Sequence, residues 1–144
     1  MSTDSRPTVS TQLHSPALQH LSEMLNRRLH EAGQSLCAND MPSLLVACND
    51  DHDNLLGAVK GEIAFTSLHV SELWVDEGAR GRGIATRLMA DIEDEARARG
   101  CTRIHLETRN PKALMLYEKL GFSIFGTLLN YADGQDFWYL QKGI

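Results

Sequence analysis

Apolar residues recur along this chain with two different periods, which indicate where helices and strands alternate. In the first third, apolar side chains repeat at helical spacing, at Leu18, Leu21, Met24, Leu25 and Leu29. Ser15 followed by Pro16 is typical of a helix N-terminus, so we predict a helix with one apolar face that ends at Gly33. The following segment, QSLCANDMP, is compatible with either a loop or a short helical turn.

The next three apolar runs have the length and composition of strands. They cover residues 41–48, 55–65 and 68–75, and short polar turns separate them. Because short turns join antiparallel neighbours, we expect these strands to form a meander. Within the second run, Gly57 and Gly61 interrupt the pattern and suggest bulges or bends.

The stretch from Leu68 to Ala98 combines the third strand with a loop rich in glycine and arginine and with a long amphipathic helix. The strand at residues 101–108 must return parallel to the third strand through this helical crossover, which makes a βαβ unit. A short helix follows from Asn110 to Gly121, and the chain closes with two strands around the turn YADG. The pattern predicts an α/β (α+β) fold with a mixed sheet of roughly six strands.

Length and composition indicate one domain. A chain of 144 residues that is 42% hydrophobic can bury one proper core. We predict a disordered tail at residues 1–13, which are rich in Ser and Thr, and a single domain at residues 14–144. No apolar run approaches the roughly 20 residues of a membrane helix, and the N-terminus lacks the apolar segment of a signal peptide. We therefore expect a soluble cytoplasmic protein with no membrane partner.

Charge and cysteine usage argue against several classes of function. Asp and Glu number 19 against 14 Lys and Arg, and the formal net charge of -5 gives no electrostatic case for nonspecific binding to nucleic acid. A cationic small substrate fits that balance better. The cysteines lack the spacing of a disulfide framework or a zinc site: Cys37, Cys48 and Cys101. The acidic turn NDDHDN matches no calcium loop, so no metal is expected.

The loop DEGARGRGIAT, between Val75 and the long helix, has the composition of an anion site. Gly81 and Gly83 remove side chains where the backbone approaches a ligand, and the free N–H groups of the first helical turn point outward. A diphosphate would fit these donors. A dinucleotide fold would need a third glycine where Thr86 stands, and a P-loop would need G-K-[ST]. Considered alone, the loop is equally compatible with a plain turn that carries solvated arginines.

Two sequence motifs at a fixed separation make the interpretation of this loop more specific. The residues from Arg80 to Ala85 match Q/R-x-x-G-x-G/A and follow a strand that ends in L-x-V. A second pattern, N-x-x-A-x-x-L-Y-x-K-x-G-F, is matched by Asn110, Ala113, Leu116, Tyr117, Lys119, Gly121 and Phe122. Together the motifs resemble the GNAT superfamily of acyl-CoA-dependent N-acetyltransferases. The resemblance implies the GNAT fold, with an antiparallel N-terminal meander, a central βαβ unit with splayed parallel strands, and a C-terminal helix and hairpin.

The resemblance also implies a site for acetyl-CoA as cosubstrate, without a metal. In the family the parallel strands splay apart, and the pantetheine arm hydrogen-bonds like an extra strand, here to Leu73, Trp74 and Val75. The diphosphate would lie on the loop and on the first helical turn, at Arg80, Gly81, Arg82, Gly83, Ile84, Ala85 and Thr86. Asn110 either contacts the cofactor or serves only as a helix N-cap.

The reaction that the resemblance implies is direct attack of a neutral amine on the thioester. Tyr117 matches the family tyrosine that protonates or hydrogen-bonds the leaving thiolate. His69 stands where some family members carry a histidine that acts as the base. In an unbroken strand, Glu72 and Trp74 share one face, and the other face carries His69, Ser71, Leu73 and Val75. A bulge would change this parity and favour Glu72 as the base, and ordered water is the third candidate.

We therefore expect an enzyme that acetylates a primary amine of a small molecule. Two alternatives stay open: acetylation of a protein or peptide, and a noncatalytic acyl-CoA-binding sensor, which would keep the loop without needing Tyr117. An exposed edge of the final hairpin could support a homodimer. The sequence carries no readable code for the acceptor.

Overall fold

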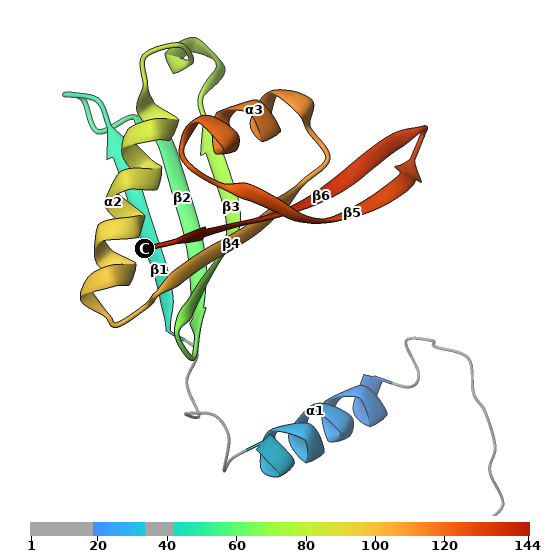
Figure 1. Cartoon of the computed structure of the whole chain (residues 1–144). Helices are drawn as coiled ribbons and strands as arrows, with labels where there is room; N and C mark the ends of the chain where they lie inside the picture. Colours follow the sequence, from blue (N-terminus) through green and yellow to red (C-terminus); the bar gives the residue numbers. More distant parts are fainter. Residues whose placement is uncertain (1–18, 34–41) are drawn as a thin grey trace, which may run out of the picture. The chain divides into compact units, whose positions relative to one another are not determined.

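The computed structural model describes residues 19–33 and 42–144 (Figure 1). The chain divides into two units, Met1–Asn39 and Asp40–Ile144. In the first unit, helix α1 spans Gln19–Gly33 and confirms the helix predicted there. The predicted N-terminal tail, the predicted helix cap and the ambiguous segment after the helix lie outside the described residues.

The second unit is built on a mixed six-stranded sheet in the order β1-β2-β3-β4-β6-β5. The strands are β1 (Ser43–Asn49), β2 (Leu55–Ala64), β3 (Ser67–Val75), β4 (Arg103–Thr108), β5 (Ser123–Ala132) and β6 (Gln135–Gly143). The connections contain the 3-10 turn η2 (Glu77–Ala79) and the helices α2 (Ile84–Ala98) and α3 (Pro111–Lys119). Neighbouring strands are antiparallel, except that β3 and β4 run parallel through the α2 crossover. The predicted meander, βαβ unit, second helix and closing hairpin are confirmed.

The hydrophobic core lies between one face of the sheet and the helices α2 and α3 (Figure 1). The buried residues of α2 follow its amphipathic period and are Leu88, Met89, Ile92 and Ala96. They meet alternate strand residues such as Val59 and Ile104, because successive side chains of a strand point to opposite faces. Each fully buried leucine or isoleucine stabilises the fold by about 1.5–3 kcal/mol. The other face of the sheet carries the residues that alternate with this core, among them the polar His69 and Glu107 and the exposed apolar Leu45 and Trp74.

A β-bulge at Ser71 changes the facing of β3 partway along the strand. Lys60 of β2 pairs with Glu72, but the next residue of β2 pairs with Val70, so Ser71 is the extra residue. Gly61 makes the bulge possible, because a Cβ there would lie 2.8 Å from the carbonyl oxygen of His69. The parity expected for an unbroken strand is therefore wrong beyond Ser71. His69 and Glu72 share the face away from the core, and Leu73 lies on the core side opposite Val59.

The parallel pair β3 and β4 separates after three residue pairs. The register runs from Ser67 opposite Arg103 to His69 opposite His105 and stops there, although both strands continue. β4 stays paired with β6 as far as Thr108, so the gap opens between β3 and β4. The backbone of Leu73, Trp74 and Val75 consequently has no β4 partner. The predicted splay of the parallel strands is confirmed.

The β5–β6 hairpin ends the chain and extends from the sheet (Figure 1). β5 is an edge strand and exposes several large apolar side chains: Phe125, Leu128, Leu129 and Tyr131. The sequence predicted such an exposed edge, and the dimer inferred from it stays a prediction.

Candidate active site

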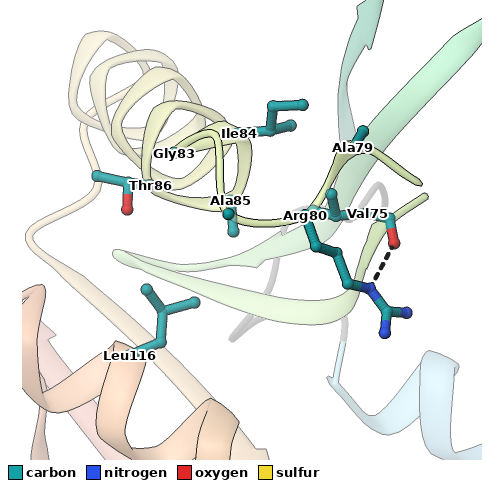
Figure 2. A pocket seen from close by; sticks show the side chains of 9 residues that line it. Val75, Ala79, Arg80, Gly83, Ile84, Ala85, Thr86 and Leu116 are labelled. Carbon is teal, nitrogen blue, oxygen red and sulfur yellow. Dashed lines mark hydrogen bonds between the residues drawn. The ribbon is translucent and has the colours of Figure 1, made fainter. Parts of the chain in front are cut away.

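A pocket of about 340 Å³ lies where the end of β3, the glycine-rich loop and the start of α2 meet (Figure 2). Its walls are formed by Val75, Ala79, Arg80, Gly81, Gly83, Ile84, Ala85, Thr86 and Leu116. Figure 2 shows Leu116 of α3 across from the first turn of α2, so the pocket lies between the two helices. Most of the predicted loop residues are therefore brought together around one cavity.

The loop adopts its shape through local capping and two left-handed glycines. The side chain of Asp76 accepts a hydrogen bond from the backbone of Gly78 at 3.1 Å and caps η2. Gly81 and Gly83 have φ angles of 79° and 76°, and a Cβ at either position would meet nothing within 4 Å. Glycine is therefore favoured there by backbone conformation rather than by lack of space.

The N-terminus of α2 presents free backbone donors to the pocket. The first hydrogen bond between turns of this helix runs from the amide of Arg87 to the carbonyl of Gly83 at 3.0 Å. The amides of Ile84, Ala85 and Thr86 precede it and have no helical acceptor. The first turn contains no acidic side chain, and Gly83 provides no side-chain cap. The arrangement is suited to an anion such as a diphosphate.

Two arginines lie beside the N-terminus of α2. The Nε of Arg80 donates a hydrogen bond to the carbonyl oxygen of Val75 at 3.2 Å, which ties the exposed side chain to the end of β3 (Figure 2). Arg82 is exposed on the same loop but does not line the pocket. Both side chains carry positive charge beside the α2 N-terminus, which reinforces the attraction for an anion.

The other predicted cofactor residues lie around the splay rather than in the pocket. Leu73 is half-buried against the core, and Trp74 is 47% exposed. Asn110 is the N-cap of α3, where its side chain accepts from the amide of Lys112 at 2.9 Å, and Pro111 opens the helix. The capping interpretation of Asn110 is confirmed, and its contact with a cofactor stays a prediction.

On the sheet face away from the core, polar residues of β3 and β4 form a connected cluster. The Nε2 of His69 lies 2.9 and 3.0 Å from the two carboxylate oxygens of Glu107. The ring of His105 stacks on that of His69, with 4.9 Å between centroids and 16° between planes. The Oγ of Ser67 lies 2.7 Å from the Nδ1 of His105. The parallel register produces this cluster, since it sets His69 beside His105 and leaves Glu107 where the strands diverge.

Glu72, the other predicted base, lies apart from this cluster. Its partner across the sheet is Lys60 of β2, and its side chain is exposed. The adjacent Ser71 donates a hydrogen bond to Glu62 at 3.2 Å. The structure therefore surrounds His69 with partners and leaves Glu72 at the surface.

Tyr117 lies on the core side of the sheet, at the end of α3 nearest the buried Phe122. It is 7% exposed, and its ring meets that of Phe122 edge-on at 5.8 Å between centroids. Burial, and secondarily the negative charge of Glu107, raise the pKa of Tyr117. The phenol therefore stays protonated at neutral pH and can donate a hydrogen bond or a proton.

The electrostatics of His105 indicate a neutral ring. Burial is the main cause that lowers the pKa of His105; the neighbouring His69 and Arg103 also lower this pKa, whereas Glu107 raises it. Glu107 thus raises the pKa of His105, which lies on the polar face of β4, and that of Tyr117, which lies on α3 at the core side of the sheet. Its position at the opening between the strands explains this reach.

Sequence reasoning missed His105, Glu107 and Ser67. A signal was available, since Ile104 and Leu106 alternate with His105 and Glu107 and so place the polar pair on one face of the strand. The register with β3 was the missing information.

The described ranges contain neither a candidate metal-binding cluster nor a helix suited to cross a membrane. There, no group of three or more His, Cys, Asp or Glu side chains is arranged to hold a metal ion. In residues 19–33 and 42–144, none of the helices has both the length and the apolar character needed to span a bilayer.

Comparisons with known proteins agree with this geometry. A model described as "Acetyltransferase (GNAT) family" matches residues 11–122. An acetyltransferase of Agrobacterium fabrum is 38% identical over 104 residues, which are 72% of this chain and 76% of that protein. Blasticidin-S acetyltransferase of Streptomyces morookaense is 36% identical over 89 residues, or 61% of this chain and 65% of that protein. The crystal structure of an acetyltransferase from Bacillus cereus matches this structure with a TM-score of 0.83 over 94% of this chain and 98% of that chain. The two sequences are 22% identical, so this match shows the shared fold.

Proposed function

The chain belongs to the GNAT acetyltransferase family, and from that premise we propose that it transfers an acetyl group from acetyl-CoA to a primary amine of a small molecule. One observation carries the proposal: the gap between β3 and β4 opens beside the free amides of the α2 N-terminus. An elongated cosubstrate with a diphosphate can use both features at once. A plain turn with solvated arginines would explain neither the splay nor the pocket.

The residues present fit coenzyme A in two places. The backbone amides of residues 82–86 and the charges of Arg80 and Arg82 are suited to the diphosphate. The backbone of Leu73, Trp74 and Val75 lacks a β4 partner and can pair with the amide groups of an extended pantetheine arm. Bound in this way, acetyl-CoA would supply the acetyl group at the gap between β3 and β4.

Tyr117 and His69 are assigned the two proton transfers. The attacking amine forms a bond to the carbonyl carbon, His69 takes a proton from the amine nitrogen, and Tyr117 gives a proton to sulfur as the carbon–sulfur bond breaks. Tyr117 carries its proton at neutral pH, as an acid in this step must, and its raised pKa keeps it protonated. His69 is favoured over Glu72 because Glu107 holds its ring, whereas Glu72 is exposed opposite Lys60. Glu72 is the second candidate for the base, since the bulge places it on the same face.

The acceptor is assigned to small amines by likeness to relatives. The curated relative from Streptomyces morookaense is named for blasticidin-S, a small molecule. The formal net charge of -5 favours an acceptor that carries positive charge. Acetylation of a protein or peptide and a noncatalytic acyl-CoA sensor are the alternatives that the experiments below separate.

Cofactor binding is tested first, by thermal unfolding and calorimetric titration with acetyl-CoA. A ligand that binds only the folded state stabilises it by about 2.7 kcal/mol at a hundred times its dissociation constant, so the melting temperature should rise. Arg80→Ala should weaken binding by about tenfold or more, because a hydrogen bond to a charged group is worth about 1.5–3 kcal/mol. Arg87→Ala is the matched control, since it removes the same charge from α2 but does not line the pocket. No rise in melting temperature at about 1 mM acetyl-CoA would reject the cofactor assignment.

The acceptor is identified by screening amines for release of thiol from acetyl-CoA. Polyamines, amino acids, aminoglycosides, nucleoside antibiotics and peptides form the panel. Turnover with a small amine supports the proposal, and turnover confined to peptides favours the alternative enzyme. Binding of acetyl-CoA with no turnover on any amine favours the sensor.

A further inference from the structure

Glu107 contacts His69 at the point where β3 and β4 separate. It stands on β4 just beyond the last residue pair with β3, and both of its carboxylate oxygens lie within 3.0 Å of the Nε2 of His69. The two side chains are 30% and 35% exposed, so the contact is partly sheltered from water. A sheltered hydrogen bond to a charged group fixes orientation better than an exposed pair does.

The chemistry of this contact determines where the histidine carries its hydrogen. An ionised carboxylate can only accept hydrogen bonds, so the hydrogen must sit on the Nε2 of His69. In the neutral ring the other nitrogen, Nδ1, is then unprotonated and able to accept a proton. Without such a partner, a histidine exchanges between its two neutral tautomers, and only one of them has the basic nitrogen at Nδ1.

We propose that Glu107 is a positioning residue for acetyl transfer, which holds His69 in the tautomer with hydrogen on Nε2 so that Nδ1 receives the proton of the attacking amine. This inference rests on the proposed function. As the bond between nitrogen and carbon forms and the bond between carbon and sulfur breaks, the amine proton moves to Nδ1 and Tyr117 protonates the sulfur. Glu107 takes no proton and stabilises the positive charge that His69 acquires.

His105 supports the same arrangement from the neighbouring position on β4. Its ring lies nearly parallel to that of His69, and Ser67 holds it through the Nδ1 at 2.7 Å. The stacking restricts rotation of the His69 ring about its side-chain bonds. Because burial lowers the pKa of His105, this neighbour stays neutral and does not repel a positively charged His69.

The competing explanation is that the contact between His69 and Glu107 only stabilises the association of β3 with β4 where the strands begin to separate. Glu62 provides a matched control, because it faces His69 directly across from β2 yet bonds to Ser71 instead. Glu62→Gln therefore removes the same charge from the same sheet face without touching the ring contact. On this sheet face, the charged and titratable groups of the strands around His69 and Glu107 include Lys60 and Glu62 on β2, Glu72 on β3, Arg103 and His105 on β4, and Tyr139 on β6.

The first measurement reads the His69 ring directly and requires no acceptor. Protein labelled with 15N in its histidine rings is examined by NMR above pH 7.5, with His69→Gln used to assign the signals. In the wild type we expect a protonated Nε2 and an unprotonated Nδ1. Glu107→Gln should yield a mixture of tautomers, since an amide can both accept and donate, whereas Glu62→Gln should retain the wild-type pattern. Hydrogen on Nδ1 in the wild type, or an unchanged tautomer in Glu107→Gln, would overturn the proposal.

The second measurement follows turnover with the amine found in the screen. Glu107→Gln should lower kcat at least tenfold with the KM for acetyl-CoA unchanged within twofold. Glu62→Gln should leave kcat within about threefold of the wild type. If the two variants lowered kcat equally, Glu107 would contribute only its negative charge or the connection between β3 and β4, and the proposed positioning role would be rejected.

Failure of this inference is distinguishable from failure of the proposed function. If an amine is acetylated but the ring spectra contradict the tautomer, only the role of Glu107 is lost. If no amine is acetylated, the proposed function fails, and the ring spectra still decide whether Glu107 controls His69.

Discussion

Replacing Gly57 by alanine should destabilise the protein and weaken acetyl-CoA binding together. A Cβ at this position would lie 2.9 Å from the carbonyl oxygen of Trp74 and 3.1 Å from side-chain atoms of both Ile84 and Leu88. Ordinary contacts between carbon atoms are about 3.5–4.0 Å, so three neighbours must move, and one of them is backbone. The neighbours belong to the end of β3 and the start of α2, the two elements assigned to the cofactor.

The expected loss of stability follows from two opposing effects. Overpacking a well-packed site costs about 1–3 kcal/mol. Alanine in a strand interior recovers about 0.5–1 kcal/mol relative to glycine. A net loss of about 1–2 kcal/mol should lower the melting temperature by about 4–8 °C for a domain of this size. Binding of acetyl-CoA should weaken at least threefold, because the strand end and the helix N-terminus are pushed apart.

Thermal unfolding and calorimetric titration measure the two effects of Gly57→Ala. Gly126→Ala is the control, since its Cβ would lie 3.8 Å from the nearest atoms, at an ordinary contact distance in another strand. That variant should melt within about 2 °C of the wild type and bind acetyl-CoA normally. A Gly57→Ala protein that melts at or above the wild-type temperature would refute the packing argument. Normal acetyl-CoA affinity in a destabilised Gly57→Ala protein would show that the cofactor does not depend on these elements.

Three further outcomes are expected. Tyr117→Phe should lower kcat with the amine acceptor about 10²–10⁴-fold, which is the usual contribution of a general acid. Calorimetry should find the affinity for acetyl-CoA unchanged. If the variant turns over as fast as the wild type, Tyr117 is not part of the mechanism. Asn110→Ala should cost about 1 kcal/mol through loss of the helix cap, and Asn110→Ser should restore it; if acetyl-CoA affinity stays normal in both, Asn110 is only a cap. His105 has a lowered pKa in the folded protein, so the unfolded chain binds a proton more readily below about pH 6.5 and stability should fall as pH decreases from there, by at most about 1.4 kcal/mol per pH unit. Denaturant unfolding at pH 7.5 and 5.5 should show a smaller change in the free energy of unfolding for His105→Gln than for the exposed control His52→Gln. Equal changes in the two variants would contradict the lowered pKa of His105.

The parts of the fold that the sequence predicted well are those with local causes. The helix α3 begins where Asn110 can cap and Pro111 can start a helix, and both signals lie within three residues of the boundary. The loop before α2 was predictable for the same reason, since Gly81 and Gly83 mark left-handed backbone positions. Alternation of apolar residues then fixed which strands were half-buried. None of these inferences required knowledge of distant contacts.

The parts that could not be predicted depend on pairing between distant segments. Ser71 is a small polar residue that fits a regular strand as well as a bulge, and its extra position is set by pairing with β2 around Gly61. The contact between His69 and Glu107 joins residues 38 positions apart, and it depends on the register of β3 against β4. A shift of one residue in that register would turn every side chain of one strand to the other face. The candidate base was therefore named from the sequence, and its partner was found only in the structure.

The bulge at Ser71 also determines how this strand must be aligned with other chains. Residues before Ser71 face the core at even numbers, such as Leu68 and Val70, and residues after it face the core at odd numbers, such as Leu73. Other chains can lack the extra residue in this strand. If β3 is aligned with such a strand without a gap, core positions of one chain are matched to polar-face positions of the other along one half of β3. A one-residue gap opposite Ser71 restores the correspondence on both sides. Deletion of Ser71 should straighten this part of β3 without inverting it, because Ser71 is the residue that the register with β2 leaves out, so Glu72 would stay on the polar face and Leu73 on the core side.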